Sequence, residues 1–514
     1  MSAQGFVAGL SPTARRALVT VCTMTATIMQ ALDTTVANVA LPYMQGSLSA
    51  SLDQINWVLT SYIVAAAIMT APMAWMADRF GRKRVFTVCA AGFTFASLLC
   101  ALSQDITAIV LARLMQGAFG AALVPLSQSV MLDSYPPEQR GSAMGIWGMG
   151  VMLGPILGPT IGGFLTENYS WHWVFLINLP VGIVTVLGLM LFLEETHKHG
   201  HLRFDWFGFV ALAIGIGALQ LMFDRGEQAG WFGSTEIVVE LIVSIAGFYY
   251  FFAHSLTTDE PFVRFEVFAD RNFVAGCLFM VVVGVGLFGT MALVTPFTQH
   301  LLGYPIMTAG YVLGARGLGT LLAMLAVGRL LKHFEARTMV FVGLSLLAGT
   351  LHAMSGFTMD TSTDMIVGSG IIQGVGIGLV FVALSTVSFT TLPGHLRNSG
   401  TAILTLIRNL GSAAGISTAI AFLTSKTTEM HAQLAEHITP FNDALQMAGP
   451  MLDPTTDQGR AVLDRILTQQ ASVIAYQNDF KLLMLFTLIT MPFVLIIGSS
   501  HTRRTGGVAA TAPA

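Results

Sequence analysis

Long apolar stretches, separated by short polar segments, dominate the chain. A helix needs about 20 mostly apolar residues to cross the hydrocarbon core of a bilayer. Stretches of that kind lie at 17–42, 55–77, 85–103, 106–132, 141–165, 172–193, 205–223, 236–255, 273–299, 308–331, 339–356, 365–391, 399–424 and 480–499. The pattern predicts an all-α polytopic membrane protein with fourteen transmembrane helices.

Lys and Arg follow the alternation that this count requires, because cytoplasmic loops of membrane proteins carry an excess of both. With both termini placed in the cytoplasm, the inner segments hold most of the cations, and the short outer loops hold Arg225 alone. Twelve or thirteen spans would spoil the alternation. We therefore expect a multi-pass protein with cytoplasmic termini.

Composition fits a chain surrounded by lipid and excludes several functions. Of the 514 residues, 54% are hydrophobic and 10% charged, and the net charge of -3 includes no basic block for nucleic acid. All four cysteines lie inside apolar stretches, so neither a disulfide framework nor a metal site is expected. No lysine follows a glycine, so the phosphate-binding loop of an ATP-driven pump is absent. No nucleophile and base pattern indicates an enzyme or a catalytic residue.

Asp33 is the only acid placed well inside any of these stretches. A carboxylate there costs roughly 2.5 to 3.5 kcal/mol on insertion scales, so its default interpretation is a functional site. Arg113, a third of the way into the fourth stretch, is the cation that we place beside it, although snorkelling to the interface is the alternative for this arginine. Alternation between a desolvated and a cation-paired environment would let Asp33 take up and release a proton.

The segment between the second and third stretches sets one carboxylate among cations. Asp78 is followed by Arg79, Gly81, Arg82 and Lys83. Asp78 could accept from a helix N-terminus or from a guanidinium across the gap between two halves of the protein, which would hold an inner gate closed. The alternative is that the cations only fix the orientation.

The fifth stretch combines a face of small residues with two prolines. Glycines recur every four residues, and prolines interrupt the same run, at Gly150, Gly154, Pro155, Gly158, Pro159 and Gly162. Such a glycine face allows another helix to approach closely, and each proline removes a backbone donor and bends the helix. Simple packing explains the glycines alone, whereas the prolines favour a shaped helix beside the substrate.

An internal repeat indicates two related halves. A shift of 257 residues aligns Asp78 with Glu335, Gln116 with Gln373, and Arg140 with Arg397. Six helices need only about 200 residues. The remaining residues of the 257-residue shift match a helix pair inserted at 205–255. We predict an N-terminal six-helix bundle at 1–200, an inserted pair at 201–256 and a C-terminal bundle at 257–514. Parallel halves of this kind bind substrate near the midplane and rock around it.

These residues resemble the major facilitator superfamily, and within it the fourteen-helix drug/proton antiporters. The similarity lies in the segment from Asp78 to Arg84, in Leu111–Gly120, in Gly148–Gly163, in Leu32–Pro42 and in Trp171–Pro180, where His172 replaces a common arginine. The resemblance implies that the glycine and proline helix limits proton leak in an antiporter. It also implies that the only energy source is the proton gradient, with no cofactor.

The polar segment 425–479 resembles, around Pro440, Phe441 and Asn442, that of EmrB-type pumps from the inner membrane of Gram-negative bacteria. This likeness implies docking to a periplasmic membrane-fusion adaptor and, through it, to an outer-membrane channel. An unpartnered amphipathic loop on the membrane is the alternative.

The resulting hypothesis is a proton-driven antiporter that exports hydrophobic or amphipathic drugs. Gln116, Arg316 and Arg408 are further candidates for contact with substrate or for coupling, because each places a polar group within a span. A proton-coupled exporter or symporter of one specific metabolite is the alternative.

Overall fold

The computed structural model of the chain describes residues 11–195, 203–258, 261–439, 452–453 and 455–498, and these residues form helices and no strands. Within these residues, thirteen helices are long and apolar enough to cross a membrane, and the count is fourteen when one bent pair is taken as a single span. The predicted fold class, an all-α polytopic membrane protein, is confirmed.

The first bundle contains α2 (Pro12–Ser47), α3 (Leu52–Thr70), α4 (Met73–Phe80), α5 (Arg82–Leu102), α6 (Ile106–Gly120), α7 (Leu123–Ser134), α8 (Arg140–Asn168), α9 (Trp173–Leu176) and α10 (Asn178–Phe192). The second predicted span is the bent pair: α3 and α4 meet at 52°. Pro72 lies at the break, where its missing N–H favours a bend. Gly81 joins α4 to α5 with a φ of 95°, a value that favours glycine.

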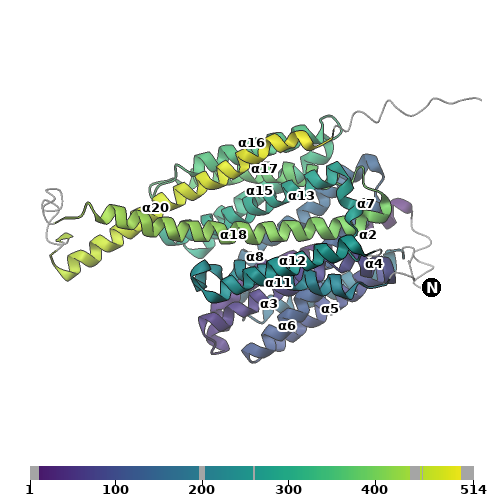
Figure 1. Cartoon of the computed structure of the whole chain (residues 1–514), viewed down its shortest axis with the longest axis horizontal. Helices are drawn as coiled ribbons and strands as arrows, with labels where there is room; N and C mark the ends of the chain where they lie inside the picture. The colour runs from purple at the N-terminus through teal and green to yellow at the C-terminus, as the bar shows by residue number, and fades with distance from the viewer. Residues whose placement is uncertain (1–10, 196–202, 259–260, 440–451, 454, 499–514) are drawn as a thin grey trace, which may run out of the picture.

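The inserted pair, α11 (Trp206–Ala229) and α12 (Thr235–Thr257), packs against both bundles. Buried residues of α11 and α12 share one hydrophobic cluster with Ala67 of α3, and Leu406 of α18 packs against the same cluster. Figure 1 shows α11 and α12 running beside α18, with α3 on their other side. A relative movement of the two bundles therefore has to change the contacts of α11.

The second bundle contains α13 (Arg271–Gly284), α14 (Thr290–Pro296), α15 (Ile306–Leu330), α16 (Ala336–Met354), α17 (Thr363–Val387), α18 (Arg397–Ala435) and α20 (Asp457–Thr490). π-Helical turns at Val285–Gly289 (η4) and Phe297–Leu301 (η5) interrupt the span that starts with α13. Turns of this type free backbone carbonyls and occur frequently at functional sites.

The outer segment at 425–479 differs from the predicted loop. Helix α18 continues to Ala435 and α20 begins at Asp457, so both ends of the segment are helical. The two helices extend beyond the other helices at the left of Figure 1. Pro440, Phe441 and Asn442, which carry part of the resemblance, lie outside the described residues.

The early start of α20 adds a second buried acid, Asp479, which the sequence did not single out. The sequence places Asp479 at the border of the last apolar stretch, at 480–499. In the structure Asp479 lies inside α20 and is fully buried. This helix buries one face in the bundle before its sequence becomes continuously apolar.

Candidate functional site

A buried polar network surrounds Asp33 in the first bundle. Asp33 accepts from Arg113 Nη1 at 2.6 Å, from Gln116 Nε2 at 2.7 Å and from Asn178 Nδ2 at 2.9 Å. Gln116 and Asn178 also donate to the hydroxyl of Ser97. The acid, the cation and the two amides are each at most 3% exposed. The structure thus brings together three of the sequence candidates: Asp33, Arg113 and Gln116.

Helix α3 forms the other wall of this network. Arg113 Nε donates to the carbonyl of Val58 at 3.1 Å, and the guanidinium lies 4.1 Å from the centre of the Tyr62 ring. Gln30 of α2 donates to the Tyr62 hydroxyl at 3.1 Å. Arg113 therefore contacts α2 and α3 from its own helix α6, and it does not snorkel toward an interface.

These contacts favour an ionised Asp33 in this conformation. All three side chains that contact the carboxylate donate hydrogen bonds to it. One of them is a guanidinium, which remains charged in proteins. A buried ion pair of this kind is tolerated when its remaining groups are also hydrogen-bonded. Protonation of Asp33 would remove the negative charge and leave Arg113 as a buried cation without an acid.

Asn178 and Ser97 are members of the network that the sequence did not single out. Asn178 is the one amide in the apolar run that follows Trp173, so its position in a span was an available indication. Ser97 gave no such indication, because serine is common in membrane helices. Near the same helix, burial lowers the pKa of His172. His172 is the residue at which the resemblance described above leads us to expect arginine.

The glycine face of α8 packs directly on α2, the helix that carries Asp33. A Cβ added at Gly154 would clash with the backbone of Ala31, and one at Gly158 would clash with Thr35. Thr35 also donates to the carbonyl of Gly154 at 2.9 Å. Gly150 and Gly162 continue this contact toward the two ends of α2. The glycines therefore serve close packing, while their helix also contacts α15 of the second bundle.

The segment after Asp78 joins the two bundles at one end, which we call the inner end from its predicted cytoplasmic position. Asn398 of α18 donates to Asp78 at 2.7 Å and accepts from Ser129 at 2.6 Å. Arg82 donates to Ser129 at 2.8 Å. The expected contact of Asp78 across the bundles is present, with an amide as a donor.

A second link at the inner end passes through Asp133 of α7, which sequence reasoning missed. One of its carboxylate oxygens accepts from Arg82 at 2.6 Å, and the other pairs with Arg397 of the second bundle. Lys83 donates its backbone N–H to Glu195, within the first bundle. We refer to Asp78, Arg82, Ser129, Asp133, Arg397 and Asn398, whose contacts join the two bundles here, as the inner gate.

Arg316 lies between the bundles. Its Nη2 donates to the carbonyl of Leu287 in the π-helical turn η4 at 2.7 Å, while Nε and Nη1 have no partner among the described residues. It lines a small cavity with Met152 and Pro155 of α8 and Met291 of α14. Pro155 therefore faces the space between the bundles, as the interpretation of a shaped helix requires. Arg408 lies apart from this cavity lining, with its guanidinium 5.9 Å from the ring centre of Phe381.

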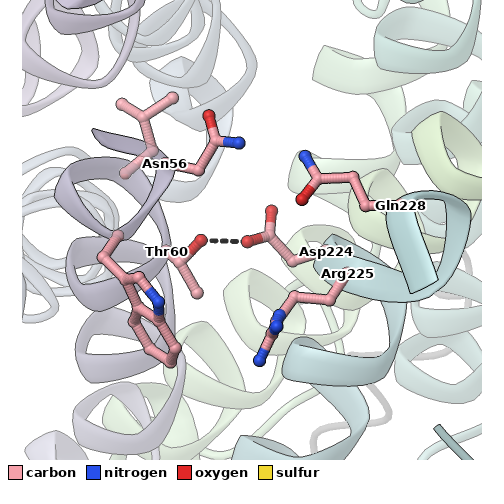
Figure 2. A pocket seen from close by; sticks show the side chains of 7 residues that line it. Asn56, Thr60, Asp224, Arg225 and Gln228 are labelled. Atoms are coloured by element: carbon pink, nitrogen blue, oxygen red, sulfur yellow. Dashed lines mark hydrogen bonds between the residues drawn. The ribbon is translucent and has the colours of Figure 1, made fainter. Parts of the chain in front are cut away.

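A larger polar cavity of about 120 Å³ separates α3 from α11. Figure 2 shows Asn56 and Thr60 on one side facing Asp224 and Gln228 on the other. Asp224 accepts from the Thr60 hydroxyl, and Arg225 pairs with Glu236 of α12. Asp224 and Arg225 are adjacent in the sequence and have separate partners. Because α3 also contacts Arg113, this cavity lies one helix away from the Asp33 network.

Comparison with known proteins agrees with this architecture. The profile of the Major Facilitator Superfamily matches residues 23–416. "Multidrug export protein EmrB" of Haemophilus influenzae is 33% identical over 471 residues, which cover 90% of this chain and 92% of that protein. "Fatty acid resistance protein FarB" of Neisseria gonorrhoeae is 31% identical over 473 residues, with coverage of 91% and 93%.

Solved structures show the same fold at low sequence identity. The proton:xylose symporter XylE superimposes with a TM-score of 0.58 at 14% identity, covering 94% of this chain and 97% of that one. The human organic anion transporter MFSD10 gives a TM-score of 0.57 at 13% identity, covering 92% and 99%. Together with the family match and the relatives above, these likenesses show that the chain belongs to the major facilitator superfamily, in which it is similar to the EmrB-type multidrug export proteins.

Proposed function

We propose that this protein exports hydrophobic or amphipathic drugs across the bacterial inner membrane in exchange for protons. The observation that carries the proposal is the buried Asp33–Arg113 pair, which ties α2 to α6 and, through Asn178, to α10. An ionisable pair within a membrane bundle is expensive and is typical of proton relays. Similarity to multidrug export proteins supports the direction of transport and the substrate class.

The coupling step follows from the contacts of Asp33. A proton entering from the outside neutralises the carboxylate, and α2 loses its charged contact with Arg113. Because α8 packs on α2 through Gly154 and on α15 across the bundle interface, a shift of α2 reaches the second bundle. Release of the proton to the cytoplasm restores the pair. One proton moving down about 100 mV supplies about 2.3 kcal/mol.

The space between the bundles fits an apolar substrate. Its lining includes Met152, Ile156, Met291 and Leu313, with Arg316 as the charged member. Methionine side chains adapt to varied shapes, which suits a transporter with several substrates. Rocking of the bundles would enlarge this space, since it lies between α8 of the first bundle and α15 of the second.

The test is transport in proteoliposomes that contain the purified protein and a fluorescent amphipathic dye. We expect dye to move against its gradient only when protons flow in the opposite direction, and an ionophore that collapses the proton gradient to stop it. Dye movement that is independent of the proton gradient would refute proton coupling. Dye accumulation in the same direction as the proton flow would show a symporter.

We further propose that the extensions of α18 and α20 dock a periplasmic adaptor that continues to an outer-membrane channel. Both helices continue past the bundle (Figure 1), and an exposed pair between His431 and Asp464 joins them there. Lys426 pairs with Glu429 along α18, so this surface is polar where the spans are apolar. A projecting polar hairpin of this kind is available for contact with a soluble partner.

Replacing residues 430–475 with a short linker is expected to abolish co-purification of the adaptor while dye transport in proteoliposomes continues. The reason is that the Asp33 network and the inner gate lie outside the deleted segment. A Glu236→Gln variant, altered at the exposed pair with Arg225 on the inserted helices, serves as a control and should retain adaptor binding. Equal adaptor recovery with the shortened protein would rule out docking at this hairpin.

A further inference from the structure

Asp479 differs from Asp33 in every contact. It is 0% exposed within the second bundle. Neither of its carboxylate oxygens has a hydrogen-bond partner, and it forms no ion pair within the described part of the chain. Asp33, by contrast, accepts from three different side chains. The two bundles therefore each bury one acid, one fully paired and the other unpaired.

The surroundings of Asp479 are aromatic. On its own helix, Tyr476 packs at 5.3 Å between ring centres against Phe297 of the π-helical turn η5. Phe480, the next residue, packs at 6.2 Å against Phe357. Aromatic residues on both sides of Asp479 in the sequence are thus packed into the bundle, and they offer the carboxyl group no positive charge. An ionised carboxylate without a partner in such a place is strongly disfavoured, and taking up a proton removes the cost.

The charged and titratable groups on the elements that pack against α20 do not supply a counter-ion. On α20 itself, Tyr476 is the neighbouring titratable group, and Lys481, two residues beyond Asp479, is exposed. The helices and turns around it contribute Arg271, Cys277, His300, Arg337, His352, Arg397, Arg408, Lys426, Glu429 and His431. None of these residues forms an ion pair or a hydrogen bond with Asp479. His300 and His352 are exposed, and Lys426 pairs with Glu429.

A series of side-chain and backbone contacts connects Asp479 to the space between the bundles. Leu483 lies one turn further along the same face of α20, and its side chain lies against Gly289 of the π-helical turn η4. In the same turn, the carbonyl of Leu287 accepts a hydrogen bond from Arg316. Arg316 is a buried cation that pairs with no acid among the described residues. A change of charge at Asp479 would therefore act on the turn that positions Arg316.

We propose that Asp479 is a second proton-binding site, which is protonated while Asp33 is ionised. Each transport cycle then carries one proton on each acid. The inference rests on the proposed proton-driven export for its role in the cycle, but the protonation of Asp479 does not depend on it. Two buried carboxyl groups in opposite environments are a recurring arrangement for dividing proton-transfer roles.

The direct test is infrared spectroscopy of the full-length protein in lipid nanodiscs at neutral pH. We expect a carbonyl band of a protonated, buried carboxylic acid that shifts in heavy water. It should be present in the wild type and in Asp33→Asn, and lost in Asp479→Asn. Asp464→Asn, which removes an exposed acid of the same helix, should retain it. No such band in the wild type, or its persistence in Asp479→Asn, would overturn the proposal.

The role in transport is tested by the number of protons exchanged per dye molecule, found from the proton gradient at which net flux is zero. We expect this ratio to fall by one in Asp479→Asn and to be unchanged in Asp479→Glu and in Asp364→Asn, which removes an exposed acid from the first turn of α17. An unchanged ratio in Asp479→Asn would show that Asp479 is not coupled. If Asp479→Asn moves no dye, recovery in Asp479→Glu supports coupling, and failure to recover contradicts it. A wild type without proton-coupled flux would instead refute the proposed function, whatever the infrared result.

Discussion

Replacing Asp33 with asparagine is expected to stop proton-driven dye export and to destabilise the protein. The asparagine side chain keeps the shape of aspartate but carries no charge and no proton that it can release. Arg113, which is 0% exposed, would then be a buried cation without an acid. Removal of one member of a buried ion pair costs about 3 to 5 kcal/mol, so thermal unfolding should begin at a markedly lower temperature.

The double variant Asp33→Asn with Arg113→Met separates coupling from folding. Methionine is apolar, unbranched and flexible, so it can occupy the space beside Tyr62 without leaving a buried charge. We expect the melting temperature to recover toward that of the wild type, while uphill export stays at the level of empty liposomes. Proton-coupled export by the double variant would contradict the assignment of Asp33 as a proton carrier.

The sequence could identify Asp33 and Arg113 because an ionised group in a membrane span stands out against apolar neighbours. The sequence could not identify Ser97, because a single serine does not stand out in a membrane span as a charged residue does. Pairing across helices depends on which faces meet, and only the structure shows that α5, α6 and α10 direct polar side chains at the same point of α2.

Two other differences between the sequence predictions and the structure have a physical origin. Asp479 was overlooked because hydropathy reports the average of a stretch, whereas one buried face of α20 is enough to enclose a carboxyl group. The segment 425–479 was predicted as a loop because it is polar, although a polar sequence can be helical when it extends beyond the membrane. Arg397 was identified only as the repeat counterpart of Arg140, and its partner Asp133 could not be assigned because it lies in a different bundle.

Replacing Asp133 with asparagine is expected to open the inner gate. Asp133 accepts from Arg82 of the first bundle and pairs with Arg397 of the second, so it links two cations that otherwise repel each other. Partly exposed ion pairs each contribute up to about 1 kcal/mol. Loss of two such pairs therefore shifts the ratio of closed to open gate by about 5- to 30-fold, and uphill export should fall because the open inner state is favoured.

The gate movement is measurable through the reactivity of one introduced cysteine. Leu331 of the second bundle is half-buried and lies against Gly141 of the first near the inner end, so Leu331→Cys is partly covered while the bundles touch. The four native cysteines are all buried. We expect Asp133→Asn to speed labelling of this cysteine by a water-soluble maleimide. Glu194→Gln removes an ion pair to Arg15 within the first bundle alone and should leave the rate unchanged. Equal rates in Asp133→Asn and the wild type would mean that Asp133 does not hold the gate, and that Asn398 with Asp78 is the link that keeps the bundles together at this end.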